Sequence, residues 1–306
     1  MATENKGDLS MAPAFRCTGL IKSYPGFRLG PLDMELEPGV VLGFIGPNGS
    51  GKTTTMRCLS GLVRPDAGDV ELCGRAVDHA DPHWKADVAI VTHRQPFYEN
   101  WSGARNLAFL AKFYPAWSAD TAAALAQRFD LALGTRVRNL SRGNRAKLGI
   151  VAALAAGPRL LLLDEPTAGL DPVVRDDVLS VLFDLLESGD RTVFYSTHIL
   201  SDIGRLADEL AFLVDGQVVL RQPVDDLVEN WRSITFRLSG EQPELTGAVY
   251  CERSGDDGRT ISCDGDLTAA HLGELGAEHI RPTPMGIDEI AVHIMKGGYH
   301  VAADQG

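Results

Sequence analysis

No apolar segment of the sequence is long enough to cross a lipid bilayer, for which about 20 consecutive apolar residues are needed. The richest stretch, residues 148–163, is interrupted by Gly157, Pro158 and Arg159. Residues 1–14 carry acidic side chains and no apolar core, so they lack the pattern of a signal peptide and we expect a disordered tail. If this protein acts at a membrane, we expect another chain to supply the spanning part.

Positive charge and paired cysteines are also scarce. The 29 basic and 41 acidic residues give a net charge of −12. An acidic surface repels nucleic acid and anionic lipid, so we expect no nucleic-acid partner. The five cysteines form no C-x-x-C pair, which gives neither a zinc knuckle nor a disulfide framework. Reduced thiols of this kind are typical of a cytoplasmic protein.

The composition divides the chain into an α/β region and a smaller tail. Residues 15–220 alternate strand-like and helix-like segments, and an alanine- and leucine-rich stretch at 96–157 predicts a helical insert. Residues 221–306 carry 7 basic and 15 acidic residues, and we expect a small α+β accessory domain there. The expected strands are 40–45, 87–92, 160–163, 192–196, 209–214, 217–220, 233–238, 279–281 and a hairpin at 248–263, and the expected helices are 52–61, 268–276 and 287–296.

The strongest motif lies at residues 46–53, where GPNGSGKT matches the phosphate-binding pattern G-x-x-x-x-G-K-[ST]. It follows an expected strand and precedes an expected helix, as the pattern requires. Glycines let backbone N–H groups surround phosphates, and the helix N-terminus adds a partial positive charge. We expect Lys52 to reach the β- and γ-phosphates and the Thr53 hydroxyl to bind Mg²⁺. A glycine-rich turn without a ligand would not explain Lys-Thr at this spacing.

A second motif, LLLLDEP at residues 160–166, places two acids at the end of a strand. Four leucines predict a strand that is buried on both faces, as in a parallel sheet, and ligands bind beyond the carboxyl ends of such strands. Asp164 suits Mg²⁺. Glu165, on the opposite face, suits the orientation or deprotonation of an attacking water. The alternative is two solvated acids at a strand end, which the phosphate motif disfavours.

Together with four further segments, these two motifs resemble the ATP-binding subunit of an ABC transporter. LSRGN at residues 140–144 is similar to the family signature LSGGQ and lies between the two phosphate motifs. Gln95 resembles the glutamine of the Q-loop, and GLD at residues 169–171 resembles the D-loop. STH at residues 196–198 resembles the segment of the switch histidine. Six motifs in the family's order are far more specific than a phosphate loop alone.

The resemblance implies a P-loop NTPase core, in which a RecA-like parallel sheet is joined by an antiparallel β subdomain and a helical insert. It implies a Mg²⁺-dependent ATP hydrolase that pairs with itself or a paralogous subunit around two ATP molecules. Such a dimer powers a separate membrane permease from the inner face of the cell membrane. Ser141 and the Gly143 N–H would contact the γ-phosphate held by the partner. The implied catalytic residues are Glu165, His198, Gln95 and Lys52; the Mg²⁺ ligands are Thr53, Gln95 and Asp164; and the nucleotide-binding residues are Tyr24 (stacked on adenine), Gly46, Pro47, Asn48, Gly49, Ser50, Gly51, Lys52, Thr53, Thr54, Ser141, Gly143 and Asp171.

Two residues depart from the family signature. Arg142 replaces its first glycine, and Asn144 replaces its glutamine. A cation at a helix N-terminus is electrostatically unfavourable by itself, although a nearby phosphate would accept it. Such variants resemble those of the drug- and peptide-export branch, so we expect an export system.

Seven of the 21 aromatic residues fall within residues 97–117. Phe109 and Phe113 are four residues apart, and this spacing predicts core packing on one helix face. Three others lie in a non-periodic segment, for which we expect an exposed patch that grips a short cytoplasmic helix of a membrane subunit. Local core packing is the alternative. The residues of this expected patch are Phe97, Tyr98 and Trp101.

Three other functions stay open at this point. A soluble ABC-type ATPase acting on the ribosome or DNA is disfavoured because the acidic chain has one cassette and no coiled coil. A P-loop kinase or GTPase is disfavoured by the signature segment and the switch histidine. A degenerate subunit that binds ATP without hydrolysing it is opposed by the intact Glu165, although Arg142 and Asn144 keep it open.

Overall fold

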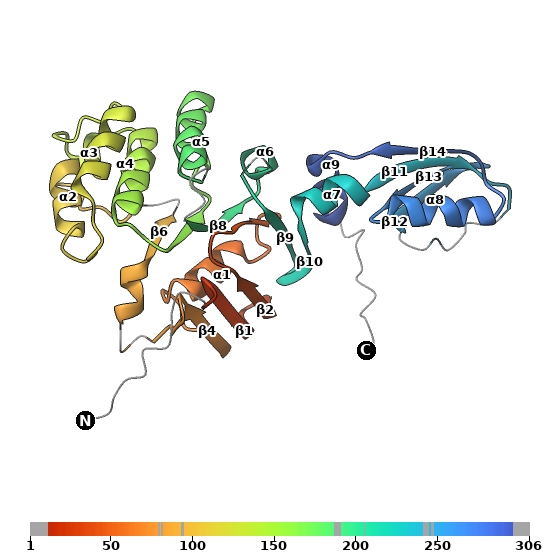
Figure 1. Cartoon of the computed structure of the whole chain (residues 1–306). Helices are drawn as coiled ribbons and strands as arrows, with labels where there is room; N and C mark the ends of the chain where they lie inside the picture. Colours follow the sequence, from red (N-terminus) through yellow and green to blue (C-terminus); the bar gives the residue numbers. More distant parts are fainter. Residues whose placement is uncertain are drawn as a thin grey trace.

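The computed structural model describes residues 12–78, 80, 82–92, 95–186, 191–204, 206–240, 245 and 248–295. Three parts lie in a row in Figure 1: a helical insert at the left, two sheets around one helix in the centre, and a smaller sheet with its helices at the right. Most of the expected amino-terminal tail, residues 1–11, lies outside the described residues. Within those ranges, no helix combines the length and the apolar character that crossing a bilayer would need.

The central sheet has five parallel strands and one antiparallel strand, in the order β10-β9-β3-β8-β7-β6. The expected hairpin turn between β9 and β10 is confirmed. Its residues Asp215 and Gly216 have φ angles of 47° and 80°, which suit a tight turn between twisted strands. The strands are β3 (Val41–Ile45), β6 (Val88–Thr92), β7 (Leu160–Asp164), β8 (Thr192–Thr197), β9 (Glu209–Val214) and β10 (Gln217–Pro223).

A second, antiparallel sheet in the order β2-β1-β4-β5 lies across from the central sheet. The helix that follows the phosphate motif fills the space between the two sheets. Met56 and Leu59 of this helix are buried in one cluster with Phe15 of the antiparallel sheet and Phe194 of the central sheet. The elements are β1 (Phe15–Tyr24), β2 (Phe27–Leu36), α1 (Lys52–Leu59), β4 (Ala67–Leu72) and β5 (Arg75–Ala76), with a 3-10 turn at Pro82–Asp87.

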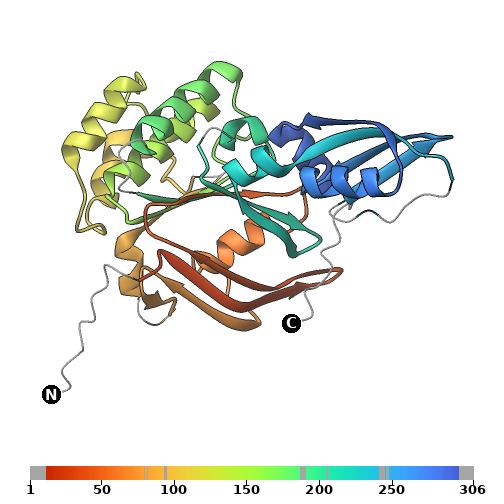
Figure 2. The same ribbon diagram turned by 45° about the vertical axis from the view of Figure 1, so that its right-hand side comes forward.

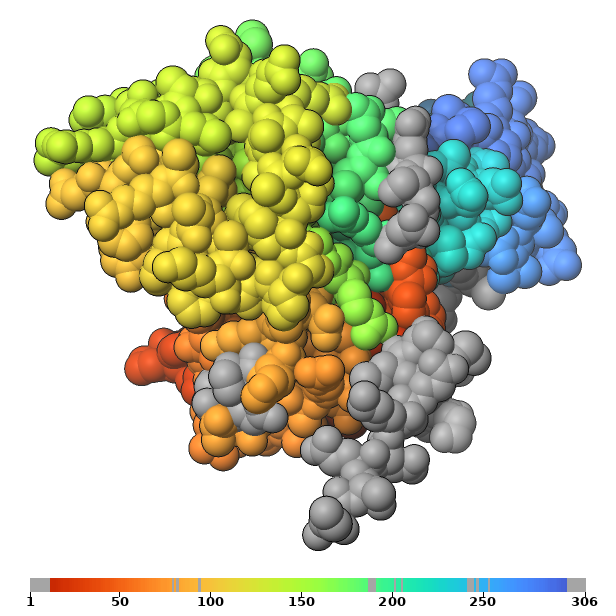
Figure 3. All heavy atoms as spheres, turned by 60° about the vertical axis from the view of Figure 1, so that its left-hand side comes forward, coloured from red at the N-terminus to blue at the C-terminus, as the bar shows by residue number. Residues whose placement is uncertain are grey.

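The insert between β6 and β7 is helical, and Figure 3 shows it as a separate yellow lobe above the amino-terminal strands. Serine residues start its helices. The Ser102, Ser118 and Ser141 side chains each accept a hydrogen bond from the backbone N–H three residues ahead, which satisfies one of the free donors of a helix start. The helices are α2 (Gly103–Leu110), α3 (Ala119–Arg128) and α4 (Arg142–Ala155), with a 3-10 turn at Val137–Asn139, and α5 (Pro172–Leu186) follows β7.

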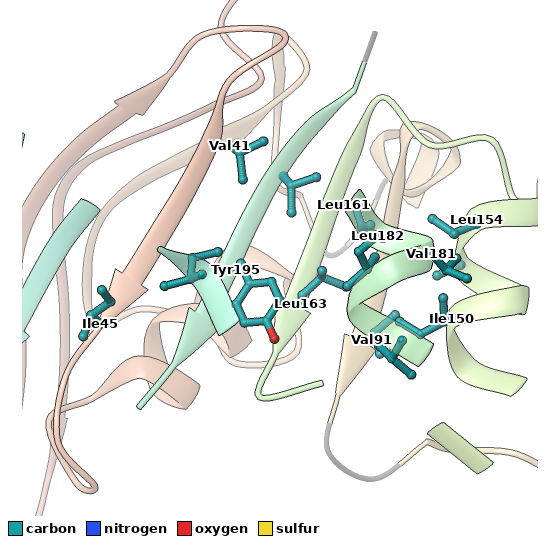
Figure 4. Close-up of a cluster of buried hydrophobic side chains, with 14 of the residues drawn as sticks. Val41, Ile45, Val91, Ile150, Leu154, Leu161, Leu163, Val181, Leu182 and Tyr195 are labelled. Carbon is teal, nitrogen blue, oxygen red and sulfur yellow. The ribbon is translucent and has the colours of Figure 1, made fainter. Parts of the chain in front are cut away.

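Strand β7 is buried on both faces, as its four leucines predict. Leu161 and Leu163 point into a cluster with α4 and α5, which Figure 4 shows around Leu182. Leu160 and Leu162 point into the opposite cluster, with α1. All four leucines are at most 1% exposed. The strand therefore fixes the position of the two acids that follow at the carboxyl edge of the sheet.

The tail forms a four-stranded sheet in the order β12-β13-β11-β14, with α8 packed on one face through Leu272. It adjoins the rest of the chain, as Figure 2 shows. Trp231 is fully buried and belongs to one cluster with Phe212 of β9 and Ile290 of α9, so an apolar joint connects the two parts. The elements of the tail are α7 (Val224–Asn230), β11 (Arg232–Arg237), β12 (Ala248–Ser254), β13 (Asp257–Ser262), α8 (Gly265–Glu274), β14 (Glu278–Pro284) and α9 (Ile287–His293), whereas the short α6 (Leu200–Ile203) lies between β8 and β9.

Candidate functional site

The loop between β3 and α1 has the geometry of a phosphate cradle. Gly51 has a φ of 114°, a conformation that side chains disfavour, and it leads the chain into α1. Lys52 is 5% exposed, and its Nζ donates to the carbonyl oxygens of Gly46 at 2.7 Å and Pro47 at 3.2 Å. The Ser50 hydroxyl is buried and has no hydrogen-bond partner among the described residues. A buried ammonium beside an unsatisfied hydroxyl fits a phosphate group.

A small cavity of about 200 Å³ adjoins this loop. It places several of the expected nucleotide-binding residues around one space, together with Glu165. The lining residues are Phe27, Asn48, Gly49, Gly51, Lys52, Thr53, Thr54 and Glu165.

Asp164 and Thr53 bring oxygen atoms together beside the cradle. Asp164 is 6% exposed, and burial raises the pKa of its carboxyl group above the usual value. Its Oδ1 accepts hydrogen bonds from the Ser196 hydroxyl at 2.8 Å and the Thr53 hydroxyl at 3.4 Å. Among the described residues, no group of three or more His, Cys, Asp or Glu side chains could hold a metal ion. Carboxylate and hydroxyl oxygens such as those of Asp164 and Thr53 are the ligand type that Mg²⁺ prefers, and this ion usually takes one or two protein ligands and shares its other positions with phosphate and water.

Glu165 places its carboxylate between the side chains of Lys52 and His198. Its Oε1 lies 3.4 Å from Lys52 Nζ, and its Oε2 lies 2.6 Å from His198 Nδ1. Its backbone has a φ of 51°, and its N–H donates to the Ser196 carbonyl oxygen at 3.0 Å. The structure thus brings the phosphate loop, through Lys52, and the switch segment, through His198, to the carboxylate of Glu165 at the end of β7. A carboxylate at such a point can orient a water molecule or accept its proton.

Gln95 lies at the same edge of the sheet. Thr92, the last residue of β6, is the register partner of Asp164, and Gln95 Nε2 donates to the Thr92 carbonyl oxygen at 2.6 Å. Gln95 and Glu165 line one cavity of about 680 Å³. A neighbouring cavity of about 810 Å³ is lined by Asp164, Glu165 and His198. The predicted catalytic residues therefore line neighbouring cavities that share Glu165, beyond the carboxyl ends of the strands.

The signature segment and the D-loop lie against each other. Ser141 is the N-cap of α4 and accepts a hydrogen bond from the Asn144 N–H at 3.1 Å. Gly143 faces Val174 of α5 so closely that a Cβ there would lie 3.0 Å from the valine side chain. Asp171 accepts a hydrogen bond from the Val174 N–H at 3.1 Å, so it caps the start of α5. Contacts of these residues with a nucleotide in a partner subunit stay a prediction.

Tyr24 ends β1 and is 41% exposed, with Lys22 Nζ 5.8 Å from its ring centroid. Its partner across the hairpin, Phe27, reaches the phosphate loop, where a Cβ on Gly51 would lie 2.9 Å from the phenylalanine ring. The sequence analysis missed Phe27, since no motif marks it. Stacking of Tyr24 on adenine stays a prediction.

An aromatic ladder lies on the helical insert. The Tyr98 ring stacks on Trp101 at 4.4 Å, and both meet the edge of Phe109 at 5.4 and 5.6 Å. Of the three residues of the expected exposed patch, only Tyr98 is exposed, at 53%. Phe97 and Trp101 are half-buried, Phe97 against the core, so the expectation of exposure is wrong for these two. The expectation that Phe113 packs in the core is wrong, because it is 61% exposed. The Phe109 and Phe113 rings do meet edge to face, with centroids 5.1 Å apart. This contact lies on the surface of the insert, at the carboxyl end of α2.

The sequence analysis also missed a buried polar cluster behind the site. The Asp202 carboxylate is fully buried, and it accepts hydrogen bonds from Thr167 Oγ1 at 2.6 Å and Arg175 Nε at 2.5 Å. The Tyr195 hydroxyl, whose oxygen is drawn in Figure 4, lies 3.3 Å from Thr167 Oγ1. The only signal in the sequence is that Asp202 lies four residues after His198, in the first turn of α6.

Comparisons with known proteins agree with this geometry. The family model described as ABC transporter matches residues 29–168. The daunorubicin/doxorubicin resistance ATP-binding protein DrrA of Streptomyces peucetius is 32% identical over 262 residues, which cover 84% of this chain and 79% of DrrA. The bacitracin transport ATP-binding protein BcrA of Bacillus licheniformis is 30% identical over 288 residues, covering 92% of this chain and 93% of BcrA. A solved structure of an ATP-binding subunit of an ABC transporter superposes with a TM-score of 0.63 at 26% identity, over 70% of this chain and 91% of that one.

Proposed function

This chain belongs to the ABC transporter family as an ATP-binding and ATP-hydrolysing subunit, and from that premise we propose its metal, its site residues and its partners. The observation that carries the proposal is the position of Glu165, whose carboxylate lies 3.4 Å from Lys52 and 2.6 Å from His198. Lys52 binds the β- and γ-phosphates, Glu165 orients and deprotonates the attacking water, and His198 contacts the γ-phosphate. Stabilisation of the transition state is mainly electrostatic and positional.

Mg²⁺ is the proposed metal, and Thr53, Asp164 and Gln95 are the residues that would hold it. When bound, the ion neutralises charge that develops on the phosphate oxygens. The support is the close approach of the Thr53 and Asp164 oxygens at 3.4 Å and the burial of that carboxylate.

Phosphate release by the purified chain tests the ATPase and its metal. We expect turnover of ATP with Mg²⁺ and its loss after chelation with EDTA, restored by added Mg²⁺. A panel of ATP, GTP and phosphate-acceptor substrates separates hydrolysis from a kinase reaction. Release that persists in EDTA would contradict the metal site, and absence of any hydrolysis would contradict the assigned reaction.

Two subunits, identical or paralogous, are proposed to enclose two ATP molecules. Ser141 and the Gly143 N–H of each subunit contact the γ-phosphate held by the other, since a helix N-terminus offers N–H donors to an anion. The support is that Ser141 starts α4, and that Gly143 and Asp171 meet at Val174 on one side of the molecule. These contacts depend on the γ-phosphate, so ATP closes the dimer and hydrolysis releases it.

A separate membrane permease is the proposed partner, and the aromatic ladder of the insert is its proposed docking surface. Tyr98 and Trp101 stack at 4.4 Å, and Arg105 covers the Trp101 ring at 4.1 Å. Tyr98 is exposed and Trp101 is half-buried, and aromatic side chains of this kind typically carry much of the binding energy of an interface. The chain would act at the inner face of the cell membrane. Export is the proposed direction, because the names of DrrA and BcrA describe drug resistance and bacitracin transport.

Substitution of the ladder tests the docking surface. We expect Tyr98→Ala and Trp101→Ala to lower co-purification with the permease at least about tenfold, because interface aromatics contribute about 2 kcal/mol or more, while basal ATPase stays within about twofold. Leu267→Ala is the matched control, since Leu267 is an apolar residue that is 47% exposed on α8, outside the insert. Equal loss of ATPase and permease binding would reject a docking role. Recovery of ribosomes or DNA in place of a membrane protein would favour the non-transport alternative.

Residues 15–220 are proposed to form the ATPase domain and residues 221–306 an accessory domain. Support comes from the separate small core of the tail, where Ile234, Phe236 and Leu272 pack together. The apolar joint at Trp231 keeps this domain attached to the central sheet.

A further inference from the structure

Arg142 links the signature helix to the catalytic turn of the same chain. It is the first residue of α4, where the helix dipole disfavours a cation. The structure gives its guanidinium a compensating position: Nη2 donates to the Ala168 carbonyl oxygen at 2.7 Å. The guanidinium also lies directly over Gly169, which has a φ of 66° and whose lack of a side chain leaves room for it.

The segment that Arg142 contacts sets the backbone of Glu165. Glu165 is a non-glycine residue with a φ of 51°, a conformation that persists only when surrounding contacts hold it. Two backbone hydrogen bonds do so: Glu165 N–H donates to the Ser196 oxygen at 3.0 Å, and Ala168 N–H donates to the Glu165 oxygen at 3.2 Å. Ala168 therefore closes the turn that begins at Glu165, and its own carbonyl oxygen is the acceptor that Arg142 uses.

This contact also crosses a gap between two parts of the fold. Arg142 lines the cavity of about 680 Å³ that Gln95 and Glu165 share. One wall of that cavity comes from the helical insert and the other from the end of β7 and the following turn. Arg142 spans from the first wall to the second.

We propose that Arg142 is a positioning residue that braces the signature helix against the Glu165 turn, so that the partner-facing segment at Ser141 and the chain's own catalytic carboxylate move as one unit. The signature LSGGQ has a glycine at this position, and a glycine has no side chain to make the link. The inference rests on the proposed roles of Glu165 and Ser141 in ATP hydrolysis.

Steady-state kinetics of the full chain test the brace. Arg142→Ala lowers kcat for ATP about three- to tenfold and leaves KM within about twofold, because the substitution disturbs the position of Glu165 and not the phosphate cradle. Arg142→Lys restores at least half of the wild-type kcat, since an ammonium can still donate to the Ala168 oxygen. Arg145→Ala is the matched control. Arg145 lies on the same helix and lines the same cavity, but its ion pair is with Glu99 at 3.2 Å. The kcat of the Arg145→Ala variant should therefore stay within about twofold of the wild-type value.

A double-mutant cycle isolates the contact. Gly169→Ala places a methyl group where the guanidinium lies, and it also strains the backbone. The strain is common to both backgrounds, so it cancels in the cycle. We expect Gly169→Ala to lower kcat at least threefold more in the wild type than in Arg142→Ala.

Strictly additive effects, or an Arg142→Ala variant as active as Arg145→Ala, would overturn the brace. A rise in KM with unchanged kcat would also overturn it. Each of these outcomes leaves the proposed function intact if the wild type hydrolyses ATP, whereas a wild type without hydrolysis rejects the proposed function and this inference together.

Discussion

Glu165→Gln is expected to lower kcat for ATP hydrolysis by at least about 100-fold, because a positioned general base contributes about 10² to 10⁴ in rate. The amide keeps the size and shape of the carboxylate, yet it can neither accept a proton from water nor carry the charge that faces Lys52 and His198. The cradle around Lys52 is unchanged, so ATP binding should persist. Phosphate release and equilibrium ATP binding, measured on the same preparation, separate the two effects.

Glu99→Gln is the matched control for this substitution. Glu99 lines the same cavity as Glu165 and its side chain is 65% exposed, so its replacement should change kcat less than about twofold. A Glu165→Gln chain that turns over at the wild-type rate would remove Glu165 from the chemical step. The same variant also tests the dimer, since ATP that is bound and not hydrolysed should hold two subunits together. Light scattering that finds only monomer with ATP, in solution and with the permease present, would contradict the shared site.

The sequence predicted best those parts of the fold whose signal is local. The four leucines of β7 specify a doubly buried strand, and each residue type of the phosphate loop has a separate physical reason to be there. Asp164 and Glu165 could be placed at the carboxyl end of an interior strand, because a run of four leucines is buried on both faces only inside a sheet. The switch segment at His198 was identified only through the resemblance. Like the two acids, however, it follows a strand that is buried on both faces, in this case β8, which is rich in β-branched and aromatic residues.

Contacts between segments that are distant in sequence were not predictable in this way. Phe27 reaches the phosphate loop because β1 and β2 fold across it, and nothing in its own neighbourhood shows this. The spacing of Phe109 and Phe113 correctly predicted that their rings meet, at 5.1 Å, but the prediction of core burial failed, because spacing alone does not show which face of the insert packs on the core. From the sequence alone, Arg142 is an unfavourable charge at a helix start. The structure shows its compensation, a hydrogen bond to the Ala168 carbonyl oxygen.

Loss of the Asp202 side chain should lower the stability of the chain markedly, although the sequence around Asp202 resembles that of a surface acid. Its carboxylate is fully buried and is held by the Thr167 hydroxyl and the Arg175 guanidinium. Thr167 lies within the turn that begins at Glu165, Arg175 lies in the first turn of α5, and Asp202 lies in the short helix α6 after His198. One carboxylate therefore ties together the segments on either side of the site.

Asp202→Ala should lower the free energy of unfolding by about 3 kcal/mol, the lower end for breaking a buried ion pair, since Arg175 is 29% exposed and can take up water. At about 2–4 °C per kcal/mol for a chain of this size, the expected fall in Tm is about 6–12 °C. Asp176→Ala is the control, since Asp176 is an exposed acid that lines a cavity of about 750 Å³ together with Arg175 and Asp202. The Tm of this variant should change by less than about 2 °C. Asp202→Asn should lie between the two, because an amide oxygen can still accept from Thr167 but no longer balances the Arg175 charge. If thermal unfolding gave Asp202→Ala and Asp176→Ala the same Tm, the buried carboxylate would not be what holds these segments together.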